Sequence, residues 1–138
     1  MQASAQTATT SKGMLWTGRV ISGLAILFLV FDGVTKVLKV PAVLKAAAEL
    51  KFSDGQIVEI GIILLICTAV YAIPRTAILG AILLTGYLGG AISIQMHAGN
   101  PVFETLFPGI FGVLVWAGIF FRDSRLRMLI PIKAYSED

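Results

Sequence analysis

Residues 76–94 read TAILGAILLTGYLGGAISI and contain no charged side chain over a length close to that of a membrane span. A helix that crosses about 30 Å of hydrocarbon at about 1.5 Å per residue needs roughly 20 residues. Three further apolar runs, at residues 14–31, 57–73 and 102–121, have a similar length, and each contains a single charged residue near one end: Arg19, Glu59 and Glu104. The sequence therefore predicts an all-α integral membrane protein built as a four-helix transmembrane bundle.

The composition agrees with the bilayer as solvent. The chain of 138 residues is 57% hydrophobic and has a mean hydropathy of +0.86, which is too apolar for a typical soluble domain. A soluble helical bundle is the alternative, and it would need partners to cover its apolar outer faces. The lone Cys67 excludes a disulfide framework. No basic cluster interleaved with aromatics occurs, so no nucleic-acid partner is expected.

The chain is expected to run up and down through spans at residues 14–37, 57–73, 76–96 and 102–121, within one domain of residues 14–131. Residues 1–13 and 132–138 are expected to form cytoplasmic tails, the first of them disordered. Between the first two spans, residues 41–52 predict a short interfacial helix that ends at Ser53 to Gly55, although a solvated connector helix fits the same pattern. The segment FDGVTK after the first run lacks the small residues of a signal-peptide cleavage site.

Positive charges are distributed unequally between the two ends of such a bundle. The side of the termini carries Lys12, Arg19, Arg75, Arg122, Arg125, Arg127 and Lys133. The opposite side carries Lys36, Lys39, Lys45 and Lys51, accompanied by five acidic residues: Asp32, Glu49, Asp54, Glu59 and Glu104. By the positive-inside rule, both termini are expected in the cytoplasm.

Small residues mark the faces on which membrane helices pack. On the first span, Gly18 and Ser22 lie on one stripe with Asp32 and Lys36. On the third span, the corresponding stripe contains Gly86, Gly90, Ser93 and His97, in which the two glycines form a GxxxG pair. Both stripes are expected to face inward and to finish in ionisable residues at the outer end.

The up-down topology gathers six polar residues at the outer mouth: Asp32, Lys36, Glu59, Gln95, His97 and Glu104. Ionisable groups at membrane depth are costly, which makes them candidates for function. A structural polar cap, with Asp32 and Lys36 paired one turn apart, and a ligand-binding or proton-handling site both remain open. No metal-binding motif is present, and no metal is predicted.

Three segments resemble the DoxX-like family of small four-helix membrane proteins. They are YAIPRTAILGAILLTGYLGGAI at residues 71–92, RVISGLAILFLVFDGVTK at residues 19–36 and FRDSRLRMLIP at residues 121–131. The family takes its name from a membrane subunit of a thiosulfate:quinone oxidoreductase, and relatives occur beside redox enzymes. The resemblance implies a multi-pass protein of the bacterial inner membrane.

The chain departs from the family pattern at its outer mouth. The pattern commonly has a histidine after LGGA and an arginine two residues later, where this chain has Gln95 and His97. Relatives often carry an acid before the cysteine of the second helix, where this chain has Leu64. The resemblance therefore implies the fold more strongly than it implies a shared chemistry.

Three functions remain open from the sequence. The first is an accessory subunit that borders a quinone-like ligand, not covalently bound, and works with a redox-enzyme partner; Phe31, Phe103, Phe107, His97 and Glu59 would surround the ligand. The second is a structural or assembly subunit, including a homo-oligomer, that docks membrane helices. The third is a membrane enzyme in which Glu59 or Asp32 relays protons with His97. Membrane lipid is a partner in all three, and activity of the chain on its own is not expected.

Overall fold

The computed structural model describes residues 11–130, and the described part consists of helices joined by short turns, with no strand. Four helices in this part are long and apolar enough to cross a membrane, which confirms the predicted fold class. They are α2 (Lys12–Val37), α4 (Asp54–Ala72), α5 (Ala77–His97) and α6 (Val102–Arg122). Shorter elements are α3 (Pro41–Glu49), the 3-10 turn η1 (Pro74–Thr76) and α7 (Ser124–Leu129).

The N-terminal boundary and the first outer loop differ from expectation. Helix α2 begins within the range expected for the tail, because the Ser11 hydroxyl accepts a hydrogen bond from the Met14 amide at 3.1 Å. Residues 1–10 and the C-terminal tail at 132–138 lie outside the described residues. Helix α3 ends at Glu49, and Ser53 begins α4 instead of ending α3. Its hydroxyl accepts from the Gln56 amide while the Gln56 side chain accepts from the Ser53 amide, a capping box.

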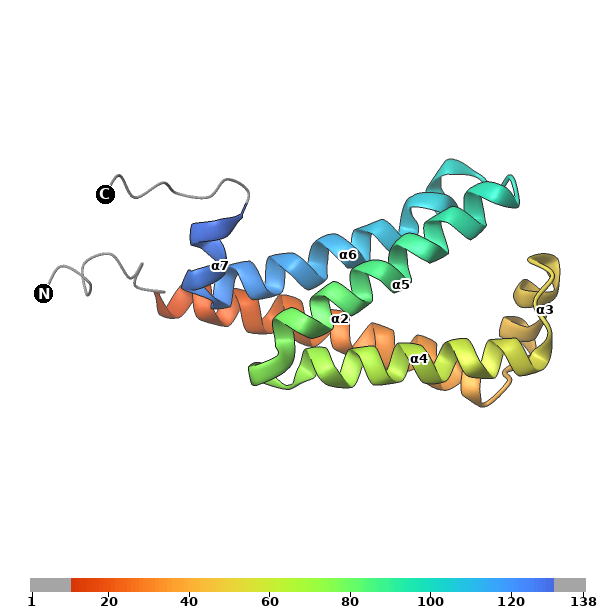
Figure 1. The fold of residues 1–138 in the computed structure, drawn as a ribbon, viewed down its shortest axis with the longest axis horizontal. Coiled ribbons are helices and arrows are strands. Elements are labelled where there is room, and N and C mark those ends of the chain that lie inside the picture. Colours follow the sequence, from red (N-terminus) through yellow and green to blue (C-terminus); the bar gives the residue numbers. More distant parts are fainter. Residues whose placement is uncertain (1–10, 131–138) are drawn as a thin grey trace, which may run out of the picture.

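The four long helices form a ring. Helix α2 packs against α4 and α6, and α5 packs against the same two helices. We call the end with the start of α2, η1 and α7 the terminus end, and the end with α3 and the α5–α6 turn the α3 end (Figure 1). Figure 1 shows the α2–α4 pair and the α5–α6 pair separating toward the α3 end.

The terminus end is packed around Tyr71, which is 1% exposed. Its hydroxyl donates to the Val115 carbonyl at 2.8 Å and lies 2.9 Å from the Ser22 hydroxyl. Since Tyr71 has one hydroxyl proton, Ser22 is the donor in the second bond. These two bonds join α2, α4 and α6 in the interior.

Glycines allow the helices to approach closely at this end. A Cβ at Gly18 would lie 2.7 Å from the Gly118 carbonyl oxygen, and a Cβ at Gly118 would lie 3.0 Å from the Tyr71 hydroxyl. On α5, a Cβ at Gly80 would collide with the backbone of Tyr71. Closer to the α3 end, Gly33 and Gly61 permit a similar contact between α2 and α4, since a Cβ at Gly61 would lie 2.9 Å from the Gly33 oxygen. The structure thus places Gly18 and Ser22 in helix contacts.

The expectation of an inward stripe at Gly86, Gly90, Ser93 and His97 is corrected, because all four residues are exposed. A Cβ added at Gly86 or Gly90 would meet nothing within 4 Å. The inward face of α5 is formed by other residues: Ala77, Gly80, Ala81, Leu84 and Leu88. The GxxxG pair can therefore contact another helix only outside this bundle.

Candidate functional site

The six polar residues expected at the outer mouth all lie toward the α3 end, on four different helices. The structure does not bring them into one cluster. Within residues 11–130, one hydrogen bond or ion pair joins two of the six, that between Asp32 and Lys36. The group divides into three parts: a pair on α2, a turn after α5, and separate residues at the surface.

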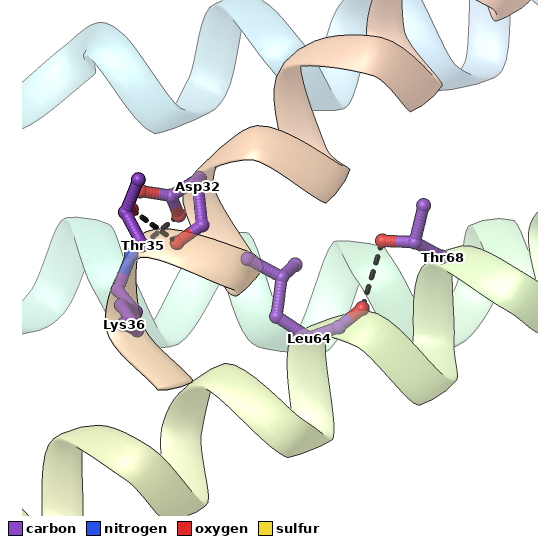
Figure 2. A network of polar contacts seen from close by, with 5 residues as sticks. All are labelled: Asp32, Thr35, Lys36, Leu64 and Thr68. Atoms are coloured by element: carbon purple, nitrogen blue, oxygen red, sulfur yellow. Dashed lines mark hydrogen bonds and ion pairs between the residues drawn. The ribbon is translucent and has the colours of Figure 1, made fainter. Parts of the chain in front are cut away.

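The pair on α2 is self-contained. The Lys36 Nζ lies 2.5 Å from Asp32 Oδ2, and the two side chains are 17% and 34% exposed. The Thr35 hydroxyl donates to the Asp32 backbone carbonyl at 2.8 Å (Figure 2). Each charge thus has its partner one turn away, which is the arrangement expected of a structural polar cap.

The middle of α4 contributes an apolar side chain, Leu64, and a hydroxyl, that of Thr68, which is bonded within its own helix. Leu64, where relatives often carry an acid, is fully buried. The buried Thr68 hydroxyl donates to the Leu64 carbonyl at 2.7 Å and is thereby occupied within its own helix (Figure 2). No hydrogen bond in Figure 2 connects this helix to the ion pair on α2.

Gln95 closes the turn between α5 and α6. Its side-chain oxygen accepts a hydrogen bond from the Asn100 side chain, and its backbone carbonyl accepts from the Asn100 amide at 3.2 Å. Gly99 supplies the positive φ of 74° that the turn requires. These bonds give Gln95 a structural role in the turn.

His97 lines a cavity at the α3 end. The cavity has a volume of about 580 Å³ and lies between the residues that follow α3 and the last turn of α5. Its wall consists of Glu49, Leu50, Lys51, Phe52, Ser93, Ile94, His97 and Ala98. Lys51 has a φ of 65°, the left-handed conformation that turns the chain away from α3.

Sequence reasoning did not place Glu49, Lys51 and Phe52 beside His97. The signal that could have found them is topological, because the first outer loop and the end of the third span must lie at the same end of an up-down bundle. The periodic pattern of residues 41–52 predicts a helix over the whole segment, so it gives no sign that the chain leaves the helix after Glu49.

The remaining polar and aromatic residues do not join this cavity. Glu59 and Glu104 are exposed. Phe31 and Phe103 are 68% and 71% exposed, so their rings face outward. Phe107 on α6 is 37% exposed and packs partly against α2, with its ring centroid 5.9 Å from that of Phe28 and 5.2 Å from that of Phe111 on its own helix.

The arrangement can bind a small polar group through the donors of Lys51 and His97. It does not connect His97 to Asp32 or Glu59 by any hydrogen bond among the described residues. In the same part of the chain, no three histidine, cysteine or acidic side chains come close enough together to hold a metal ion.

The comparison with known families identifies the family of this chain. The sequence model of the DoxX-like family matches residues 20–118. No curated protein and no solved structure matches the chain. The matched range begins in the first transmembrane helix and ends in the fourth, so it covers the bundle and the residues that line the cavity.

Proposed function

Because the chain belongs to the DoxX-like family, we propose that this small integral membrane protein is an accessory subunit of a membrane redox system. In this proposal it holds the headgroup of a quinone in the cavity beside His97. The membrane proposed is the bacterial inner membrane, with both termini in the cytoplasm. The observation that carries the proposal is the cavity itself, with its two cationic or hydrogen-bonding side chains next to an aromatic ring.

The chemistry of a quinone headgroup suits this wall. The headgroup is a flat ring with two carbonyl oxygens, which accept hydrogen bonds and donate none. Lys51 and His97 can supply donors, whereas Phe52, Leu50 and Ile94 offer apolar surface. A volume of about 580 Å³ lies within the range of roughly 300–1,000 Å³ found for small-molecule sites.

The position of the cavity also suits a ligand with a lipid tail. Ile94 and Met96, on the last turns of α5, are 37% and 66% exposed. In the proposal a tail that leaves the cavity follows this apolar surface into the bilayer. The chain contributes binding and orientation, and a partner enzyme carries out the electron transfer.

The test is to purify the full chain in a mild detergent and measure bound quinone per chain by mass spectrometry of the lipid extract. We expect near-stoichiometric quinone in the wild type and at least a tenfold loss in a Lys51→Met, His97→Gln double variant. Lys39→Met is the matched control, because Lys39 is an exposed lysine with positive φ outside the cavity wall. Wild-type protein without quinone, or equal loss in the control, would contradict the proposal.

A second function, assembly with another membrane subunit, is favoured by the exposed glycines of α5. Gly86 and Gly90 both have open space around them, and such faces allow two helices to approach closely. Cross-linking in the membrane tests this function. If it holds, Gly90→Leu loses a cross-linked partner while the quinone content of the purified chain is unchanged.

A further inference from the structure

A second cavity lies on the surface between α5 and α6, and its wall consists mostly of apolar side chains and glycines. It is a groove of about 600 Å³ whose wall includes Trp116 and Phe120, and residues of α7 close its end toward the terminus end. The groove-lining residues at this end are Leu126 of α7 and Ile130, which directly follows α7. Nothing in the proposed quinone site uses this groove.

Glycines create the hollow. Gly89 on α5, with Gly109 and Gly112 on α6, lines the groove. A Cβ at Gly89 would meet nothing within 4 Å, and those at Gly109 and Gly112 would make ordinary contacts at 3.5 and 3.8 Å. Close helix packing therefore does not require these glycines, and their effect is to leave space that side chains would otherwise fill.

The length of the groove matches one leaflet. Its wall on α6 runs from Gly109 to Phe121, which corresponds to about 18 Å along a helix. Half of the hydrocarbon thickness is about 15 Å. A groove of this length fits one lipid chain from a single leaflet.

The interior of the groove offers no free polar group. The Trp116 Nε1 donates to the Thr85 hydroxyl at 2.7 Å, and the Thr85 hydroxyl donates to the Ala81 carbonyl at 2.7 Å. These two polar side chains satisfy each other within the wall. The occupant of the groove is thus expected to be apolar along its length.

Positive charge lies at the end of the groove that α7 closes. Arg125 and Arg127 flank the groove-lining Leu126 in sequence, so they project to either side of it on the helix. Arg127 Nη1 donates to the carbonyl of Phe120, which itself lines the groove, at 2.7 Å. The nearby Asp123 carboxylate is engaged in capping α7, where it accepts from the Arg125 amide at 2.8 Å.

We propose that the groove holds an anionic phospholipid of the leaflet at the terminus end. One acyl chain lies along the glycines between α5 and α6, and the phosphate lies beside the exposed Arg125. Charge complementarity selects this occupant, because an apolar trough that ends beside a guanidinium group matches a long chain that ends in a phosphate. A protein helix would match both features only if it carried an acidic residue at this end.

The test measures lipid retained by the full chain after reconstitution into vesicles with equal amounts of phosphatidylglycerol and phosphatidylcholine, extraction in mild detergent and native mass spectrometry. We expect phosphatidylglycerol to be enriched about tenfold in the wild type. Arg125→Gln should lower this enrichment about fivefold, as expected for one interfacial arginine. Arg75→Gln is the control, an exposed arginine of the turn η1 at the same end, and should leave the enrichment unchanged.

A matched glycine pair tests the groove independently of charge. Gly89→Leu fills the groove and should reduce retention of both lipids at least fivefold, whereas Gly86→Leu, also in open space but outside the wall, should not. Circular dichroism and a thermal melt in detergent verify that each variant is folded. Equal retention of the two lipids by the wild type, equal effects within either variant pair, or a protein partner cross-linked in the groove would overturn the proposal. Its failure would leave the quinone measurement unaffected.

Discussion

The two ends of the bundle differ in how closely their helices pack. At the terminus end, the Tyr71 hydroxyl ties α2 to α6, and Gly18, Gly80 and Gly118 bring the helices into close contact. At the α3 end, α3 packs on α2 and α4, and a cavity separates the residues that follow it from α5. The contrast is one between a closely packed base at the terminus end and a more open mouth at the α3 end.

The largest expected effect is a difference in thiol labelling between the two ends of the bundle. Labelling in intact cells is all or none, because only one end faces the cytoplasm. A cysteine introduced at Lys45, exposed on α3, should react with a membrane-impermeant thiol reagent in intact cells. A cysteine at Arg75, in the turn η1, should react only after lysis. The native Cys67 is buried and lies within α4, so it contributes little background. The reverse labelling pattern would invert the orientation.

The next largest effect is expected at Gly80, where the base is tightest. Gly80→Ala places a Cβ against the Tyr71 backbone and should lower the free energy of unfolding in detergent by about 3 kcal/mol. Gly86→Ala on the same helix has open space and should be neutral or stabilising by up to about 1 kcal/mol. Equal effects of the two alanines would show that the base is no more tightly packed than the lipid-facing surface.

A smaller effect is expected when the interior hydrogen bonds of the base are removed. Tyr71→Phe takes away the acceptor of Ser22 and the donor to Val115, which should cost about 1 kcal/mol of unfolding free energy. Thr17→Val removes an exposed hydroxyl that bonds within its own helix and serves as the control. In a double-mutant cycle, Ser22→Ala should cost less in the Tyr71→Phe background than in the wild type, and additive costs would deny the coupling.

The smallest effect is expected at the α3 end, for the ion pair of Asp32 and Lys36. Both side chains are partly exposed, so Lys36→Gln should lower the free energy of unfolding by about 0.5 kcal/mol. Exchanging the two residues, Asp32→Lys with Lys36→Asp, should restore part of the lost stability. A thermal melt in detergent measures the stability of each variant. If Lys36→Gln lowered the free energy of unfolding as much as Gly80→Ala does, the mouth would be as sensitive to substitution as the base, and the contrast between the two ends would be wrong.

The spans were predictable because a run of about 20 mostly apolar residues remains recognisable even when it contains one charged residue. Which face of a span points inward was not predictable by the same means. Helix α5 is apolar on all sides, so the exposed Gly86 and Gly90 and the buried Gly80 and Ala81 look alike in the sequence. The inward face of α5 is defined by contacts with residues of other helices, such as that of Gly80 with Tyr71, and the sequence of α5 alone does not contain these contacts.

The candidate site shows the same limit. Six polar residues at one end of the bundle could be predicted from topology, but their grouping depends on side-chain contacts that the topology does not fix. Asp32 is satisfied by Lys36 within α2, and Gln95 is satisfied by Asn100 in its turn. His97 lines one cavity together with Lys51 and Glu49, at the place where α3 ends earlier than its pattern indicated and Ser53 starts a new helix.

The buried Tyr71 hydroxyl also bears on the order in which the chain assembles during synthesis. Its acceptor, the Val115 carbonyl, belongs to the last of the four spans, whereas Ser22 belongs to the first. Until α6 has entered the membrane, the hydroxyl of Tyr71 faces hydrocarbon with one partner at most. We therefore expect a ribosome-bound chain that ends before α6 to remain an open set of helices, and the arrival of the last span to lock the first one in place.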